Sequence, residues 1–148
     1  TAYEITYGDW SSDVCSSDLE GAKAIGGSIF QADLDLTNPL GYGFTDRKIS
    51  VYRNGLTFLQ PSKNNYANIA MYTASPLIGG YLHKSQLQRV ANSAAIVFHP
   101  EGAGRVILFS DNPNFRGTWY GTNKLFLNAV FFGQLVSMPG GNFGQTED

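Results

Sequence analysis

The 148-residue sequence contains one cysteine, Cys15, and two histidines, His83 and His99. A disulfide needs two cysteines, and a zinc site needs three or four ligands that converge on one ion. Neither histidine lies in an H-x-x-E or H-E-x-x-H pattern, so structural roles are expected for both. We therefore expect no metal site formed by this chain itself.

The chain also lacks a long apolar run and a strong excess of one charge. A membrane-spanning helix needs about 18 or more consecutive apolar residues, and no such run is present. Ten Lys and Arg against twelve Asp and Glu give a formal net charge of -2, which provides no argument for nucleic acid. We expect neither a nucleic-acid nor a membrane partner. The hydrophobic content of 43% and the aromatic content of 14% predict a folded globular domain.

Residues 9–19, DWSSDVCSSDL, show no apolar periodicity typical of a helix or a strand. They place Cys15 between acidic neighbours, which disfavour a reactive thiolate. The string resembles, residue for residue, the translation of a common sequencing-library adapter, and Gly8 fits the same reading. We interpret Gly8 to Leu19 as an assembly artefact and assign Cys15 no chemical role. Without the three aspartates of this stretch, the sequence has nine acidic residues and ten Lys and Arg, and the formal net charge becomes +1.

Alternation of apolar and polar residues, together with short runs rich in Val, Ile, Phe and other apolar residues, predicts several strands in the remaining chain. They are expected at residues 28–36, 49–59, 67–72, 93–99 and 104–110. Within the second of these, Asn54-Gly55 indicates either a hairpin turn or a bulge. Residues 100–103 are expected to join the last two strands as a tight loop.

Two helices are predicted in the second half of the chain. Ser85 is expected to cap a short helix whose apolar face includes Leu87 and Val90. Thr122 is expected to cap a longer helix over residues 123–132, which is apolar on nearly every side and should be largely buried. The order of these elements indicates an α/β or α+β layered domain.

The segment VFHPE, residues 97–101, resembles the F-H-P-E segment of class I glutamine amidotransferases. In those enzymes the histidine is the general base for a cysteine nucleophile, and the glutamate orients the histidine. This chain has no Gly-x-Cys-x-Gly elbow, and the two strands must turn at this point. Two interpretations follow: a hairpin tip, or a residual amidotransferase-like hydrolase that uses His99 and Glu101.

The loop DNPNFRGTWYGTN begins at Asp111 and carries the candidate binding residues. They are Asp111, Asn112, Asn114, Arg116, Trp119 and Tyr120. Asp111 and Arg116 can pair, and the two asparagines can bond the backbone of their own turns. The aromatic side chains could line a pocket or an interface. The alternative is a rigid loop whose arginine is paired internally and whose aromatic residues complete the core.

Residues 104–133, GRVILFSDNPNFRGTWYGTNKLFLNAVFFG, resemble the C-terminal region of large bacterial zinc carboxypeptidase-like metallopeptidases. Residues 25–44 and 75–98 are similar to earlier parts of the same region. The resemblance implies a partial class I glutamine amidotransferase-like (flavodoxin-like) α/β domain over residues 25–136, preceded by an N-terminal strand segment. Residues 1–24 would then be the start of a fragment, and residues 137–148 a Gly-rich, flexible tail.

The zinc ligands and the catalytic glutamate of that family match no position here. The resemblance therefore implies no catalytic residue and no cofactor in this chain, whereas zinc would belong to an upstream peptidase domain of the parent protein. It implies a non-catalytic accessory domain whose partners are that peptidase domain and its peptide substrate, in an exported or periplasmic parent. A further interpretation is a purely structural fragment with an unpaired sheet edge and exposed apolar surface.

Overall fold

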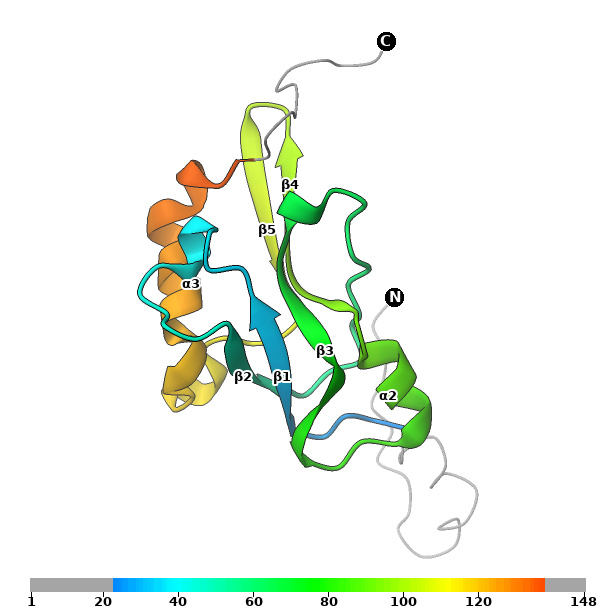
Figure 1. Ribbon diagram of the computed structural model, residues 1–148. Helices are drawn as coiled ribbons and strands as arrows, with labels where there is room; N and C mark the ends of the chain where they lie inside the picture. The colour runs from blue at the N-terminus through cyan, green and yellow to red at the C-terminus, as the bar shows by residue number, and fades with distance from the viewer. Residues whose placement is uncertain (1–22, 138–148) are drawn as a thin grey trace, which may run out of the picture.

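The computed structural model describes residues 23–137, and a five-stranded sheet lies at its centre (Figure 1). The strand order is β2-β1-β3-β4-β5, and every pair of neighbours is antiparallel. The elements are β1 (Ser28–Leu34), β2 (Lys48–Arg53), β3 (Asn68–Gly80), α2 (Lys84–Val90), β4 (Ala94–Glu101), β5 (Gly104–Phe109) and α3 (Tyr120–Phe132), with short 3-10 helices η1 (Pro39–Gly41), η2 (Asn65–Ala67), η3 (Phe115–Gly117) and η4 (Gly133–Leu135).

The sheet and the two helices confirm a mixed α/β domain. Flavodoxin-like domains are built on parallel strands, whereas the strands of residues 23–137 pair only in the antiparallel direction. The amidotransferase-like assignment is therefore not confirmed by this sheet. The adapter-like stretch and residues 138–148 lie outside the described residues. No helix of the described part is long and apolar enough to cross a membrane.

Alternation correctly predicted β1, and the two apolar runs joined by a tight loop correctly predicted the β4–β5 hairpin. In β1, every second residue from Ser28 to Leu34 is buried, as expected for a strand that packs one face on the core. β4 and β5 pair in continuous register from Ile96 opposite Phe109 to Glu101 opposite Gly104. Gly102 has a φ of 56°, which suits glycine in the tight turn.

Neither the hairpin turn nor the bulge considered at Asn54-Gly55 forms, because the strand ends before these residues. β2 ends at Arg53 and pairs with β1, and Leu59 forms only an isolated bridge with Ala94. The physical reason is the Arg53 side chain, which donates hydrogen bonds to the carbonyl oxygens of Gly55 and Thr57. The segment after β2 therefore wraps around this guanidinium instead of returning along the strand.

The predicted cap of α2 is also displaced. His83, not Ser85, is the N-cap residue, because its Nδ1 atom accepts a hydrogen bond from the backbone N–H of Ser85 at 3.3 Å. Val90 is buried as predicted, but Leu87 is 37% exposed. Gln86 takes the inward position instead and donates to the carbonyl oxygen of Lys23 at 3.2 Å.

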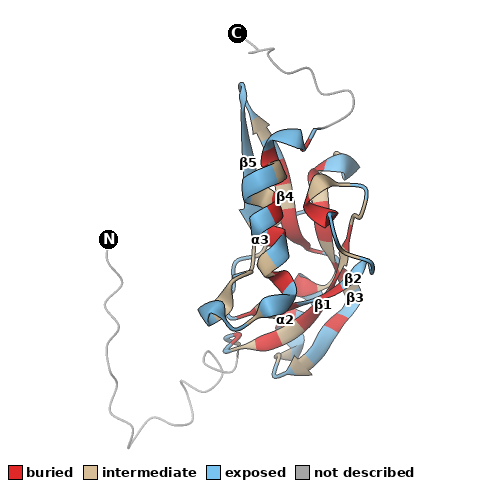
Figure 2. Cartoon of the chain, turned by 90° about the vertical axis from the view of Figure 1, so that its left-hand side faces the viewer, coloured by how far each residue is buried: buried red, intermediate tan, exposed pale blue. Residues whose placement is uncertain are grey.

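The prediction that helix α3 is largely buried is wrong. Its buried residues are Thr122, Leu125 and Asn128. Its large apolar side chains face outward: Phe126, Leu127, Val130 and Phe131 are 42%, 51%, 61% and 72% exposed (Figure 2). Asn128 explains the orientation, since its Nδ2 atom donates to the carbonyl oxygens of Leu40 and Tyr42 at 2.8 and 2.9 Å.

Candidate functional site

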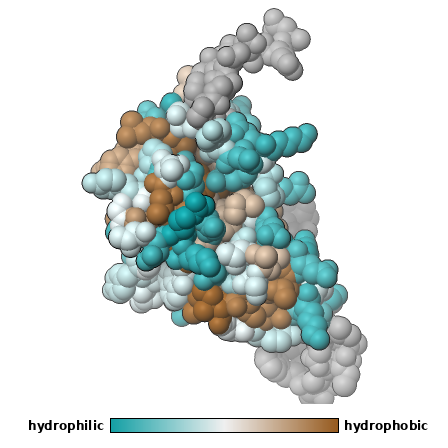
Figure 3. Space-filling view, viewed as in Figure 1, coloured by the Kyte–Doolittle hydropathy of each residue, from teal (hydrophilic) through white to brown (hydrophobic). Residues whose placement is uncertain are grey.

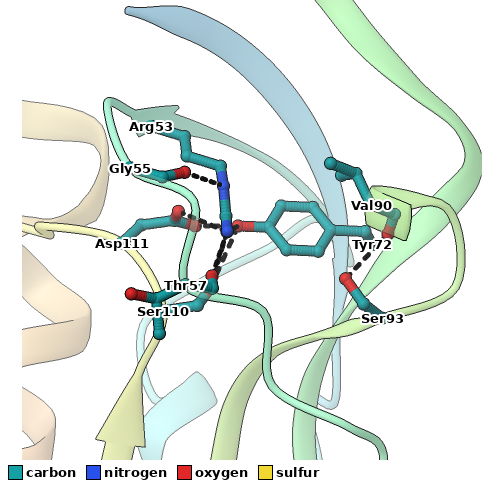
Figure 4. Close-up of polar contacts among 8 residues, drawn as sticks. All are labelled: Arg53, Gly55, Thr57, Tyr72, Val90, Ser93, Ser110 and Asp111. Atoms are coloured by element: carbon teal, nitrogen blue, oxygen red, sulfur yellow. Dashed lines mark hydrogen bonds and ion pairs between the residues drawn. The ribbon is translucent and has the colours of Figure 1, made fainter. Parts of the chain in front are cut away.

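Arg53 is the most unusual residue of the core. The alternation of β2 points Ile49, Val51 and Arg53 to the same buried face, and the Arg53 side chain is 1% exposed. A guanidinium that leaves water needs a counter-charge and a full set of acceptors. The surroundings of Arg53 supply both (Figure 4).

The counter-charge is Asp111, which follows β5. Its Oδ1 atom lies 3.1 Å from Nη1 of Arg53, and its side chain is 9% exposed. β2 and β5 are the two edge strands of the sheet. The ion pair therefore joins the ends of the two edge strands.

The remaining contacts of Arg53 complete its coordination. Nε donates to the carbonyl oxygen of Gly55 at 3.1 Å, Nη1 also donates to the Tyr72 hydroxyl at 2.9 Å, and Nη2 donates to the carbonyl oxygen of Thr57. The guanidinium carbon lies 4.7 Å from the ring centroid of Phe58, within cation–π range. Each of the three nitrogens of Arg53 therefore has an acceptor.

Tyr72 links the two charges. Its hydroxyl donates to Oδ2 of Asp111 and lies 3.1 Å from Oγ of Ser110. Burial raises the pKa of the Tyr72 hydroxyl above its ordinary value, and the negative charge of Asp111 raises it further. Burial also raises the pKa of the Asp111 carboxyl, although the hydrogen bond from Tyr72 and the charge of Arg53 act in the opposite direction.

This network has little room for a ligand. The cavity beside Asp111, lined also by Tyr52, Pro113 and Thr122, has a volume of about 10 Å³. Such a volume holds one water molecule at most. The network is therefore suited to fixing the base of the loop that begins at Asp111 rather than to binding a substrate.

Asn112 bonds the backbone of its own turn, as predicted, whereas the Asn114 side chain makes no such bond to its turn. Oδ1 of Asn112 accepts from the backbone N–H of Asn114 at 3.0 Å. Asn123, with its side-chain amide oriented to satisfy its neighbours, donates to Oδ1 of Asn114 at 2.8 Å. Oγ1 of Thr122 donates to the carbonyl oxygen of Pro113 at 2.7 Å, so Thr122 anchors the loop rather than capping the helix.

The predicted pair between Asp111 and Arg116 is wrong, because Asp111 is committed to Arg53. Arg116 lies at the exposed turn η3, where its φ is 51°, and its guanidinium carbon is 5.2 Å from the ring centroid of Phe115. The turn directs Arg116 toward solvent on the outside of the loop. Of the two charged candidates, one is therefore buried and the other is exposed.

The aromatic candidates lie beside β2. The ring of Tyr52 stacks on Phe115 with centroids 4.0 Å apart and lies 6.0 Å from Trp119. Nε1 of Trp119 is buried without a hydrogen-bond partner among the described residues. Tyr120, which begins α3, is 78% exposed. An open hollow of about 450 Å³ lies here, lined by Ile49, Ser50, Trp119, Tyr120 and Gly121.

His99 and Glu101 lie at the exposed end of the β4–β5 hairpin. Nε2 of His99 is 3.6 Å from Oε2 of Glu101, and the two side chains are 66% and 76% exposed. Cys15, the only thiol of the sequence, lies outside the described residues. Within residues 23–137, no three His, Cys, Asp or Glu side chains come together in a group that could hold a metal ion.

Sequence reasoning missed Arg53 and Tyr72. A signal for Arg53 was present in the pattern Ile49-x-Val51-x-Arg53, which places the arginine on the apolar face of its strand. Tyr72 carried no comparable signal, since a tyrosine at a buried strand position is ordinary. No known family model matches the chain, and no curated protein or solved structure matches it.

Proposed function

We propose that this chain is a non-catalytic accessory domain of a zinc carboxypeptidase-like metallopeptidase. The parent would hydrolyse peptides with zinc held in an upstream peptidase domain, and it would be exported or periplasmic. The support for the parent is the resemblance of residues 104–133 to the C-terminal region of such enzymes. The amidotransferase-like fold belongs to the same proposal, with further strands supplied by the parent.

The observation that supports a binding role is that the loop after β5 is held in a fixed conformation. Its base is fixed by the Arg53–Asp111 pair, and its turns are fixed by Asn112 and Thr122. A pre-ordered loop loses little conformational entropy when it binds. Arg116 and Tyr120 are the exposed side chains that this frame presents, and arginine and tyrosine are enriched where interfaces gain most of their energy.

The contact partner would be the peptidase domain or its peptide substrate. An exposed guanidinium beside an aromatic ring is suited to a carboxylate, since it can form two parallel charge-assisted hydrogen bonds. Asp111, Asn112 and Asn114 would act indirectly, by positioning the loop. The hollow beside Trp119 and Tyr120 would receive an apolar side chain of the partner.

The first test is a long sequencing read across the locus in the source DNA. We expect the codons for residues 8–19 to be absent and an upstream peptidase domain with an H-x-x-E motif to precede this region. An upstream region without such a domain would contradict the proposed parent. In the complete protein, Arg116→Ala should raise KM or lower stability while the zinc content stays unchanged, and Lys63→Ala serves as an exposed control. Loss of zinc in Arg116→Ala would also count against the proposal.

One observation favours a second candidate function, an amidotransferase-like hydrolase. His99 and Glu101 are within 3.6 Å of each other, as a base and its orienting carboxylate would be. Both are exposed, which weakens the case, because such pairs act in sites from which water is largely excluded. A glutaminase assay on the purified chain decides: activity that disappears in His99→Ala would favour the hydrolase over the accessory domain.

A further inference from the structure

The outward face of α3 carries several large, exposed apolar side chains. Phe126, Leu127, Val130 and Phe131 all lie on it, and Leu135 of η4 extends it with 65% exposure. Figure 3 shows apolar surface over the C-terminal part of α3, at the upper left of the view. Exposed patches of this kind on a folded domain mark interaction surfaces.

The segment of sequence that forms this face carries charges of one sign. Between Asn112 and Thr146 the sequence contains two cations, Arg116 and Lys124, and no acid. Lys124 is exposed and donates to the carbonyl oxygen of Gly43 at 2.8 Å, which places its ammonium group near the beginning of α3. A suitable partner therefore offers an apolar surface with partial negative charge opposite Lys124.

A second copy of the same helix in the antiparallel direction meets both conditions. Residues 126 and 130, and residues 127 and 131, form rows at a spacing of four, and residues 127 and 130 form a row at a spacing of three. Rows of the two kinds pack together at the small crossing angle, about 20°, of helix bundles. With a two-fold axis at the level of residue 129, Leu127 faces Phe131 of the second copy, and Lys124 faces Gln134. Lys124 then lies at the C-terminal end of the other α3, where the helix dipole is negative.

We propose that this face of α3 is the interface of a symmetric homodimer. The two helices pair in the antiparallel direction about a two-fold axis, so the same residues contribute from each side and the assembly closes at two copies. The two Lys124 side chains are then separated along the axis by about ten residues, or about 15 Å, beyond the screening length at physiological salt. The proposal is independent of the parent and of the loop after β5.

Sedimentation of the full 148-residue chain tests the interface, in a Cys15→Ser background that excludes an adventitious disulfide. We expect a reversible monomer–dimer equilibrium. Phe131→Glu should raise the dimer dissociation constant by about 30-fold or more, as for a central interface residue. Tyr66→Glu, at an aromatic residue that is 58% exposed on η2, should leave the constant unchanged.

Disulfide cross-linking tests the antiparallel pairing of the two helices directly, without introducing a charged residue into the interface. Val130→Cys lies next to the axis and should form a disulfide-linked dimer on mild oxidation. Gln134→Cys, about 15 Å from its symmetry mate, should not. A monomer at all concentrations, open-ended aggregation, a dimer unaffected by Phe131→Glu, or a cross-link through Gln134→Cys that Val130→Cys lacks would each overturn the proposal.

Discussion

Arg53 and Asp111 form a buried salt bridge between Nη1 and Oδ1, 3.1 Å long, across 58 positions of sequence. The pair joins the residue that ends β2 to the loop that leaves β5, the two edges of the sheet. It therefore couples the closure of the fold to the position of the candidate binding loop.

Asp111→Ala should destabilise the domain by about 3–5 kcal/mol, because it leaves the Arg53 guanidinium buried without its counter-charge. Urea unfolding followed by circular dichroism measures the change in the free energy of unfolding. Asp33→Ala is the matched control, since it removes the acid of the exposed Arg47–Asp33 pair. That change should cost much less, because an exposed ion pair contributes little to stability. Equal losses in the two variants would show that the buried pair does not close the sheet.

Alkaline pH should destabilise the domain through Tyr72. The folded state raises the pKa of Tyr72, so the unfolded chain ionises first, and stability falls as pH rises above about 10. Tyr72→Phe removes this ionisation, and its free energy of unfolding should vary less between pH 9 and pH 11. The same measurement on Tyr66→Phe, at an exposed tyrosine, should reproduce the slope of the unmodified chain. A Tyr72→Phe slope as steep as the original would contradict the assignment.

Asn128→Leu should lower stability by about 1–3 kcal/mol even though it adds an apolar group to a buried position. The carbonyl oxygens of Leu40 and Tyr42 would lose their donor inside the protein. Thermal unfolding measures the loss, and Gln88→Leu, at an exposed position of α2, provides the comparison. An Asn128→Leu variant of unchanged or higher stability would mean that α3 is not oriented by this amide.

His83→Ala should destabilise α2 by about 1 kcal/mol, the usual cost of losing an N-cap. Ser85→Ala should cost less, because that side chain only supports the His83 ring through a 2.8 Å contact between Oγ and Nδ1. Amide hydrogen exchange in residues 84–90 resolves the two effects. Faster exchange in Ser85→Ala than in His83→Ala would instead favour the cap predicted from sequence.

Local patterns decided what could be predicted of the fold and the site. The β4–β5 hairpin depends on two adjacent apolar runs and a tight turn with Gly102, all within about fifteen residues, so the sequence predicts it correctly. The turn bonds of Asn112 are equally local and were also predicted. Arg116 as the partner of Asp111 was the nearest choice in sequence, and it was wrong, because the competing partner comes from another strand.

By itself, the sequence determined the apolar alternation of β1, the last hairpin, the existence of both helices and the polar turns of the loop after β5. These features depend on periodicity and on residues within one turn of each other. Only the tertiary structure decided that Arg53 is buried beside Asp111 and that α3 turns Asn128 inward and Phe131 outward. Both outcomes depend on which distant carbonyl or carboxylate groups the fold places beside the buried side chain. A buried polar group must be satisfied wherever its partner comes from, and this requirement overrides the local pattern.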